Sequence, residues 1–446
     1  MVYRTQFPPE FAFGVSAAAY QTEGAYNQDG KGPSIWDDFC HRNRRRWRGE
    51  SGATACDFYN RYPQDLALMA QMGIGNFRTS VAWSRVLPEG SGPVNQAGLD
   101  YYDRLVDTCL ARGITPWLTL YHWDLPLALE RKGGWANRAV LPAFERFAEV
   151  VARRLGDRVR HWMVLNEPMV FAGAGYFLGF HAPGRRGFGS FLPAAHHATM
   201  AMGVGGRVLR ACLPAGARIG TTFSQAWVEP YGTDDRHNQA AMRAEVILNR
   251  FFLEPVLGLG YPLEHTPVLQ KIYKYHLAGD EGLLPFDFDF LGMQLYTREV
   301  VRHSFWTPYA KAKIVHPAKR GVPHTVMGWE VYPEALYQML HRWHAHYGIK
   351  RIVVTENGAA FPDQLQAGRV NDPERTAYLQ SHLAQLQRAV AAGAPVEGYF
   401  VWTFTDNFEW AHRFAPRFGL VYTDYATQER IVKDSGHWYA GFLAGA

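Results

Sequence analysis

Strand-like and helix-like segments alternate along almost the whole of this 446-residue chain, and this alternation limits its fold more than any other feature. Eight short, largely apolar runs are separated by segments whose apolar residues recur at three- and four-residue spacing, which is typical of helices. The predicted strands lie at 13–15, 76–81, 115–120, 161–165, 218–223, 289–295, 351–355 and 396–403. The predicted helices lie at 57–72, 95–112, 137–155, 193–213, 238–257, 332–347 and 372–392.

Glycines follow four of these helices, at Gly73, Gly113, Gly348 and Gly393. Glycine readily adopts the left-handed conformation that often ends a helix, so these positions support the predicted boundaries. Eight β-α units without a low-complexity linker predict an α/β fold, namely a single (β/α)8 TIM barrel over residues 1–446.

The chain is longer than a typical barrel of about 250 residues. The surplus is therefore expected in long loops after the strands, within 24–55, 169–192 and 299–330. A doubly wound sheet is the main alternative. It would usually carry a glycine-rich phosphate turn after an early strand, and no G-x-G-x-x-G or Walker pattern opens a helix here.

Two glutamates stand at the ends of predicted strands, in Asn166-Glu167-Pro168 and Thr355-Glu356-Asn357. A carboxylate at the end of a buried strand is costly unless its charge is used. Each glutamate alone could be a structural salt-bridge partner. Because functional groups of a barrel gather at the carboxyl ends of its strands, the two together predict acid/base and nucleophilic chemistry, as in glycoside hydrolysis.

Polar and aromatic residues also occupy the ends of other predicted strands, where a packed core alone would place Val, Ile and Leu. They are Gln21, Arg78, His122, Gln294, Tyr296, Trp402, Glu409 and Trp410. The chain contains 14 Trp, and aromatic rings stack well on the apolar faces of sugars. These residues therefore favour a carbohydrate site at one end of the barrel.

The motifs at these positions resemble those of family 1 glycoside hydrolases, of the retaining β-glucosidase type. The resemblance runs from Phe7 almost to the carboxyl terminus. Its motifs are Ala19-Tyr20-Gln21-Thr22-Glu23-Gly24, Tyr121-His122-Trp123-Asp124, Leu165-Asn166-Glu167-Pro168, His181-Ala182-Pro183-Gly184, Met327-Gly328-Trp329-Glu330, Thr355-Glu356-Asn357-Gly358 and Asp406-Asn407-Phe408-Glu409-Trp410. Any one motif is weak evidence, but all of them in this order are specific.

The resemblance implies that Glu356 is the catalytic nucleophile and Glu167 the acid/base residue. Arg78 and the Tyr296 hydroxyl are expected to keep Glu356 ionised, because a positive charge and hydrogen bonds favour the anion. The nearby negative charge should raise the pKa of Glu167, so that it stays protonated in the free enzyme. A bell-shaped pH profile is expected.

The resemblance further implies that the remaining residues bind the terminal sugar. Gln21 and Glu409 would bind O4, and Glu409 would also bind O6. His122 and Trp410 would bind O3, and Asn166 would bind the 2-hydroxyl. Trp402 would stack on the ring, Phe418 would lie near C6, and Trp329 would line the leaving-group site.

Two positions depart from the family pattern. Gln294 stands where the family commonly has Asn, so its longer side chain could point elsewhere. Residues 403–406 read Thr-Phe-Thr-Asp in place of Ser-Leu-Leu-Asp, a change expected to alter packing behind the site more than its chemistry.

The expected activity is that of a retaining exo-β-glycosidase, a β-glucosidase acting by double displacement. It would release terminal β-D-glucosyl residues from β-glucosides and cello-oligosaccharides, consistent with cellulose degradation and carbohydrate metabolism. β-Galactosides or β-fucosides are expected as further substrates, and transglycosylation is open. The alternatives are a 6-phospho-β-glycosidase, disfavoured because Glu409 would repel a phosphate, and a catalytically dead sugar-binding scaffold, disfavoured because both carboxylates are present.

Other features set expectations about partners and location. The net charge of +5 is mild, and the basic run 41–48 is interpreted as a solvated loop, so no nucleic-acid partner is predicted. The spacing of His341, His344 and His346 does not place all three on one helical face, so no metal or cofactor is predicted.

The amino terminus lacks the apolar core of a signal peptide, and no run of about 18 apolar residues occurs. A cytoplasmic protein with no membrane partner is therefore expected, with four cysteines as free thiols, although a Cys40–Cys56 bridge stays open. The sequence leaves the formation of a homo-oligomer open.

Overall fold

The computed structural model describes residues 2–445 and confirms the predicted (β/α)8 barrel. Eight parallel strands follow the order β5-β4-β3-β2-β1-β11-β8-β6, and pairing of β5 with β6 closes the barrel. The strands are β1 Ala12–Ser16, β2 Asn76–Ser80, β3 Thr115–Tyr121, β4 His161–Asn166, β5 Arg218–Pro230, β6 Phe290–His303, β8 Ile352–Asn357 and β11 Val396–Trp402. All eight coincide with segments predicted from the sequence.

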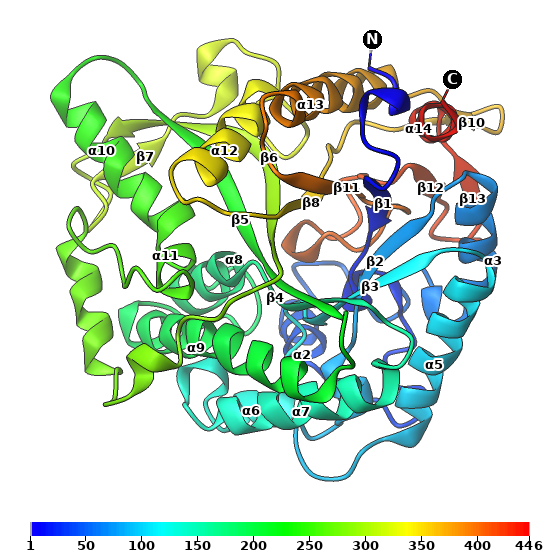
Figure 1. Ribbon diagram of the computed structural model, residues 1–446, viewed down its shortest axis with the longest axis horizontal. Coiled ribbons are helices and arrows are strands. Elements are labelled where there is room, and N and C mark those ends of the chain that lie inside the picture. Colours follow the sequence, from blue (N-terminus) through cyan, green and yellow to red (C-terminus); the bar gives the residue numbers. More distant parts are fainter. Residues whose placement is uncertain (1, 446) are drawn as a thin grey trace.

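Helices lie between successive strands and cover the outside of the barrel (Figure 1). The long ones are α3 Phe58–Gln71, α5 Gln96–Ala111, α7 Val140–Leu155, α9 Phe188–Cys212, α10 Asp235–Glu245, α12 Glu334–Ala345, α13 Pro373–Ala391 and α14 Asp434–Ala444. The short ones are α1 Ala19–Thr22, α2 Ile35–Arg42, α4 Trp83–Val86, α6 Leu127–Arg131, α8 Pro168–Ala172 and α11 Leu253–Val256. Short strands outside the barrel are β7 Ala312–Ile314, β9 Leu365–Gln366, β10 Arg369–Val370, β12 Val421–Thr423 and β13 Arg430–Val432.

The glycines predicted to end helices do so. Gly73, Gly113, Gly348 and Gly393 have φ values of 71°, 72°, 63° and 90°. This left-handed conformation carries little steric cost for glycine, so the chain can turn away directly after each helix.

Several predicted boundaries were wrong. Strands β5 and β6 continue well past the barrel, because they pair with each other as far as Pro230 and Val301. The helix predicted at 238–257 is divided into α10 and α11 by a π-helical turn, Val246–Arg250. Helix α14 was not predicted.

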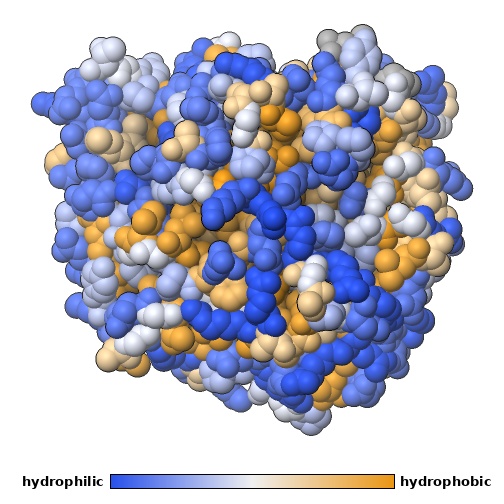
Figure 2. All heavy atoms as spheres, viewed as in Figure 1, coloured by the Kyte–Doolittle hydropathy of each residue, from blue (hydrophilic) through white to orange (hydrophobic). Residues whose placement is uncertain are grey.

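The interior of the barrel is filled by side chains at its amino-terminal end. Trp117, Met163, Phe290, Val353 and Phe400 form a buried cluster contributed by five strands. Figure 2 shows that hydrophilic residues cover much of one face of the molecule, with hydrophobic residues between them. Among residues 2–445, no helix has the length and apolar character needed to cross a membrane.

The two ends of the described chain meet at one side of the barrel (Figure 1). Phe442 of α14 packs its ring 5.1 Å from that of Phe13 in β1. The four cysteines Cys40, Cys56, Cys109 and Cys212 are free thiols, so the Cys40–Cys56 bridge that the sequence left open is not formed. Burial raises the pKa of the Cys40 and Cys56 thiols to about 12.

Candidate active site

A cavity of about 300 Å³ opens at the carboxyl ends of the barrel strands. Nine of the residues predicted for the site line it: His122, Glu167, Tyr296, Trp329, Glu356, Trp402, Glu409, Trp410 and Phe418. The other four, Gln21, Arg78, Asn166 and Gln294, are fully buried and contact residues of this lining. The structure therefore gathers the whole predicted set around one cavity.

The Glu356 carboxylate is held by three donors. Nη1 of Arg78 lies 2.5 Å from Oε1, and Nε2 of Gln294 donates to the same oxygen at 2.7 Å. The Tyr296 hydroxyl donates to Oε2 at 2.6 Å. Both oxygens are thus fixed by charged or polar hydrogen bonds from strands β2 and β6, which leaves the carboxylate little freedom to rotate.

Glu167 stands in a different environment. Its backbone has φ 45°, a left-handed conformation uncommon for a residue other than glycine, and helix α8 begins directly after it. Its side chain is buried in the cavity wall near Ser224 of β5. No cation forms an ion pair with it among the described residues.

These environments separate the two carboxyl groups electrostatically. Burial and then the negative charge of Glu356 raise the pKa of Glu167 well above its usual value. Burial also raises the pKa of Glu356, but Arg78, Tyr296 and Gln294 act against that rise. The ionised form is therefore favoured more at Glu356 than at Glu167.

Asn166 connects these groups to His122. Its Oδ1 accepts hydrogen bonds from Arg78 at 2.5 Å and from Gln294 at 2.6 Å, and its Nδ2 lies 3.1 Å from Nε2 of His122. Burial, with Arg78 nearby, lowers the pKa of His122 well below its usual value. A neutral imidazole can both donate and accept hydrogen bonds, which suits a hydroxyl-bearing ligand.

Glu409 lines the cavity from the loop after β11. Its Oε2 accepts a hydrogen bond from Nε2 of Gln21 at 3.3 Å. Burial and the charge of Glu356 raise the pKa of Glu409 to about 8. Trp410 follows it with φ 45°, so the loop presents adjacent polar and aromatic side chains through a backbone conformation that costs free energy.

Aromatic rings form much of the remaining wall. The ring of Trp329 lies 5.1 Å from that of Tyr296 and 6.0 Å from that of Phe418. Trp402 lies 6.0 Å from His122 and is almost fully buried. These flat apolar surfaces, next to convergent polar groups, suit a ring-shaped ligand with hydroxyl groups.

The sequence analysis missed several residues of the lining. Trp123 and His181 belong to motifs that were recognised, so that signal was available. Ser224 completes the set, because β5 was the one strand without a predicted site residue. Phe180 and His412 also line the cavity, but they lie in loops whose course the sequence pattern does not reveal.

The basic run 41–48 and the histidines His341, His344 and His346 lie outside the cavity. Residues 41–48 do not line it, although Arg42 donates a hydrogen bond to the Pro183 carbonyl at 2.8 Å, close to His181. Within the described residues, no group of three or more His, Cys, Asp or Glu side chains is arranged to hold a metal ion.

Comparison with known proteins agrees with this geometry. The model of glycosyl hydrolase family 1 matches residues 3–445. The chain is 41% identical to "Beta-glucosidase A" of Thermotoga maritima, covering 98% of each chain, and 40% identical to a "Bifunctional beta-D-glucosidase/beta-D-fucosidase" of Bifidobacterium breve, again covering 98% of each. A crystal structure of the Thermotoga maritima β-glucosidase in complex with glucoimidazole superposes with a TM-score of 0.93, at 40% identity, over 98% of this chain and 99% of that one.

This barrel, with a cavity lined by carboxylates and aromatic rings at the strand ends, therefore defines a glycoside hydrolase. The chain belongs to glycosyl hydrolase family 1.

Proposed function

We propose that the protein is a retaining β-glucosidase that removes the terminal β-D-glucosyl residue of β-glucosides and cello-oligosaccharides. The observation that carries this proposal is the pairing of Glu167 and Glu356 in one cavity, where Arg78, Gln294 and Tyr296 donate hydrogen bonds to Glu356 and not to Glu167. The donors stabilise one carboxylate as an anion, and burial keeps the other protonated. The activities named for the relatives support the choice of sugar.

In the first step Glu356 attacks the anomeric carbon while Glu167 donates its proton to the glycosidic oxygen. The bond between that carbon and the oxygen breaks, the aglycone leaves as an alcohol, and the sugar becomes an ester of Glu356. Arg78, Gln294 and Tyr296 orient the attacking oxygen. The raised pKa of Glu167 favours its protonated form, which can donate the proton to the leaving oxygen.

In the second step the now ionised Glu167 removes a proton from water, and the water oxygen attacks the anomeric carbon. The ester bond to Glu356 breaks, and the sugar is released with its β configuration retained. An alcohol can take the place of water, and the product is then a new β-glycoside. Transglycosylation is therefore an available route of the same mechanism.

The remaining predicted roles also belong to this proposal. Gln21 and Glu409 bind O4, Glu409 also binds O6, His122 and Trp410 bind O3, and Asn166 binds the 2-hydroxyl, with Trp402, Phe418 and Trp329 as the apolar walls. One carboxylate shared between O4 and O6 can serve either orientation of O4. This supports β-fucosides and β-galactosides as further substrates, and a bifunctional relative agrees.

The two alternatives find less support. A 6-phosphoglycoside would bring its phosphate towards Glu409, and no cation forms an ion pair with Glu409 among the described residues. A sugar-binding scaffold without activity would not need the asymmetric donor set around Glu356. We also propose a cytoplasmic location, supported by the four free cysteines.

The stereochemistry of the first product tests the mechanism. Hydrolysis of 4-nitrophenyl β-D-glucoside is followed by ¹H NMR at early times, before mutarotation. β-Glucose should form first, and α-glucose appears only later. α-Glucose as the first product would show inversion and contradict the proposal, and no hydrolysis of any β-glycoside in a panel of gluco, galacto, fuco and 6-phosphogluco substrates would favour the binding scaffold.

A further inference from the structure

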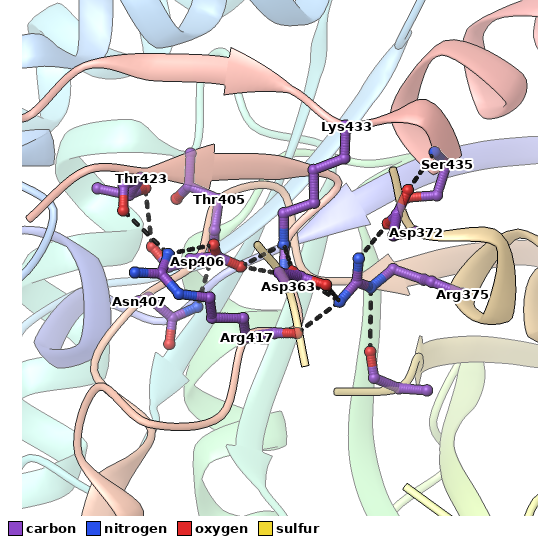
Figure 3. Close-up of polar contacts among 12 residues, drawn as sticks. Asp363, Asp372, Arg375, Thr405, Asp406, Asn407, Arg417, Thr423, Lys433 and Ser435 are labelled. Carbon is purple, nitrogen blue, oxygen red and sulfur yellow. Dashed lines mark hydrogen bonds and ion pairs between the residues drawn. The ribbon is translucent and has the colours of Figure 1, made fainter. Parts of the chain in front are cut away.

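A second cluster of charged side chains lies behind the loop that follows β11 and carries Glu409 and Trp410, which we call the sugar-binding loop. It consists of three carboxylates, Asp363, Asp372 and Asp406, and three cations, Arg375, Arg417 and Lys433, and we call it the Asp406 network (Figure 3). Lys433, Asp406, Asp372 and Arg375 are almost completely buried. The sugar-binding proposal does not use any of these residues.

Asp406 stands three residues before Glu409 in the sequence. Lys433 donates to its Oδ1 at 2.7 Å, and Arg417 donates to its Oδ2 at 2.7 Å. The backbone N–H of Gly419 also donates to Oδ1, at 2.9 Å. Burial acts against ionisation, but Lys433 and Arg417 outweigh it and lower the pKa of Asp406. The carboxylate is therefore a fixed anion with both oxygens bonded.

The contacts of Asp406 join two segments that each carry residues of the cavity wall. One is the loop after β11, which continues from Asp406 to Glu409 and Trp410. The other contains Phe418, which lies between Arg417 and Gly419, and both of these neighbours donate to Asp406. A Cβ atom added to Gly419 would lie 2.2 Å from the backbone nitrogen of Asp406, so the two segments are in close contact.

Lys433 links this junction to the rest of the network. Its ammonium lies between Asp406 and Asp363 and pairs with both (Figure 3). Asp363 accepts from Nη2 of Arg375 at 2.9 Å, and the same nitrogen donates to the Arg417 carbonyl at 2.7 Å. Arg375 also pairs with Asp372, which caps the start of α14 by accepting from the Ser435 N–H at 2.8 Å.

The network thus ties the sugar-binding loop to the segment after β8, to the first turn of α13 and to the residues that precede α14. Opposite charges are equal in number and each is paired. A buried, fully paired set of charges holds its members in one arrangement, because any displacement exposes an unpaired charge to a low-dielectric interior.

We propose that Lys433 and Asp406 are positioning residues for sugar recognition. They fix Glu409, Trp410 and Phe418 from behind, so that the carboxyl-terminal segment, far from the cavity in sequence, sets the affinity for the terminal sugar. This inference rests on the proposed function, because it assigns Glu409 and its neighbours to the sugar.

The first test uses Lys433→Met, which removes the ammonium but keeps a similar volume. Binding of glucoimidazole is measured by calorimetry, and hydrolysis of β-glucoside and β-fucoside is measured in parallel. Misplacing a recognition group by about 1 Å can cost up to about 100-fold, so glucoimidazole binding should weaken between about 10- and 100-fold. The loss in kcat/KM should be larger for the glucoside than for the fucoside, because fucose lacks the O6 that Glu409 binds.

Arg138→Met is the matched control. Arg138 also pairs with a buried carboxylate, Asp280, at 2.5 Å, but neither residue lines the cavity. It should lower stability and leave glucoimidazole binding within about twofold. Equal losses of binding in the two variants would show that the effect follows stability alone and would overturn the proposal.

The double variant Lys433→Met/Asp363→Asn separates positioning from charge balance. It leaves two carboxylates and two cations in the network, so the melting temperature should recover towards that of the wild type. Asp406 still lacks its lysine, and binding should therefore stay weak. Recovery of binding in step with the melting temperature would contradict a positioning role.

If Lys433→Met does not fold, Arg417→Met and Arg417→Lys provide the same test from the edge of the network, where Arg417 is partly exposed. The methionine variant should bind glucoimidazole more weakly, and the lysine variant should recover part of the affinity. Wild-type affinity in both would overturn the proposal. Failure of the proposed function would look different, since the wild type itself would then neither hydrolyse β-glucosides nor bind glucoimidazole.

Discussion

Two buried clusters of charge lie on either side of the loop that follows β11, and they are balanced in opposite ways. Three carboxyl groups line the cavity, Glu167, Glu356 and Glu409, and Arg78, buried behind this lining, pairs with Glu356. The Asp406 network has three carboxylates and three cations, all of them paired. Accordingly, pKa values are raised at the three cavity carboxyls and lowered at Asp406.

The two clusters differ because the cavity carboxyls are proposed to take part in the reaction, whereas the Asp406 network holds the residues around them in place. In the cavity, burial and the nearby charge of Glu356 raise the pKa of Glu167, as expected for the acid/base role that we propose. Full pairing in the network holds its charged groups in one arrangement. The loop after β11 therefore connects the two clusters, with Asp406 in the network and Glu409 in the cavity.

The largest expected effect comes from removing the anion of the cavity. Glu356→Ala should lower kcat by at least about 10⁴-fold, the scale of losing a catalytic nucleophile. Added azide should restore turnover by entering the vacated space, and the product should be the α-glucosyl azide, because only one displacement occurs. Retained activity without azide, or a β-azide product, would assign the nucleophile to another residue.

The network should respond mainly in stability. Arg375→Met leaves Asp363 and Asp372 buried without their cation, which should lower the free energy of unfolding by about 3–5 kcal/mol in a denaturant titration. Arg388→Met removes an exposed pair with Glu334 and should cost less than about 1 kcal/mol. Similar small losses in both variants would mean that the network contributes no more than a surface ion pair.

Removing a carboxyl group from the cavity should instead raise the free energy of unfolding. The pKa of Glu409 is raised to about 8, so its ionised form is disfavoured in the folded protein. Glu409→Gln should therefore stabilise the protein at pH 7 by about 1–3 kcal/mol. The gain should be absent at pH 4, grow with pH above the unfolded pKa and level off above pH 8. Destabilisation at pH 7 would show that the carboxylate is already compensated.

The smallest expected effect concerns the departure at Gln294. Its amide reaches Glu356 at 2.7 Å, and the shorter Gln294→Asn would lose that contact while keeping the amide. We expect kcat/KM to fall about tenfold, the value of one hydrogen bond to a charged group. The variant Gln294→Ala should lower kcat/KM by at least the same factor. Full activity in the asparagine variant would show that an amide one methylene shorter still serves Glu356.

The eight strands and most of the predicted site residues could be recognised because they stand at or near strand ends, inside local motifs, whereas Phe180 and His412 lie in loops without such a signal. The extension of β5 and β6 could not, since it arises from their mutual pairing outside the barrel. The aim of Gln294 depends on its rotamer. The Asp406 network joins residues up to 70 positions apart, such as Lys433 and Asp363, and no local pattern marks such pairs.

The central claim is that burial and the negative charge of Glu356 together raise the pKa of Glu167. ¹³C NMR of the labelled glutamate carboxyl groups can follow the titration of Glu167 in the wild type and in Glu356→Gln. The account predicts a high pKa in the wild type, equal to the pKa of the basic limb of kcat/KM, and a clearly lower value in the variant. A Glu167 pKa that is the same in both proteins would contradict it.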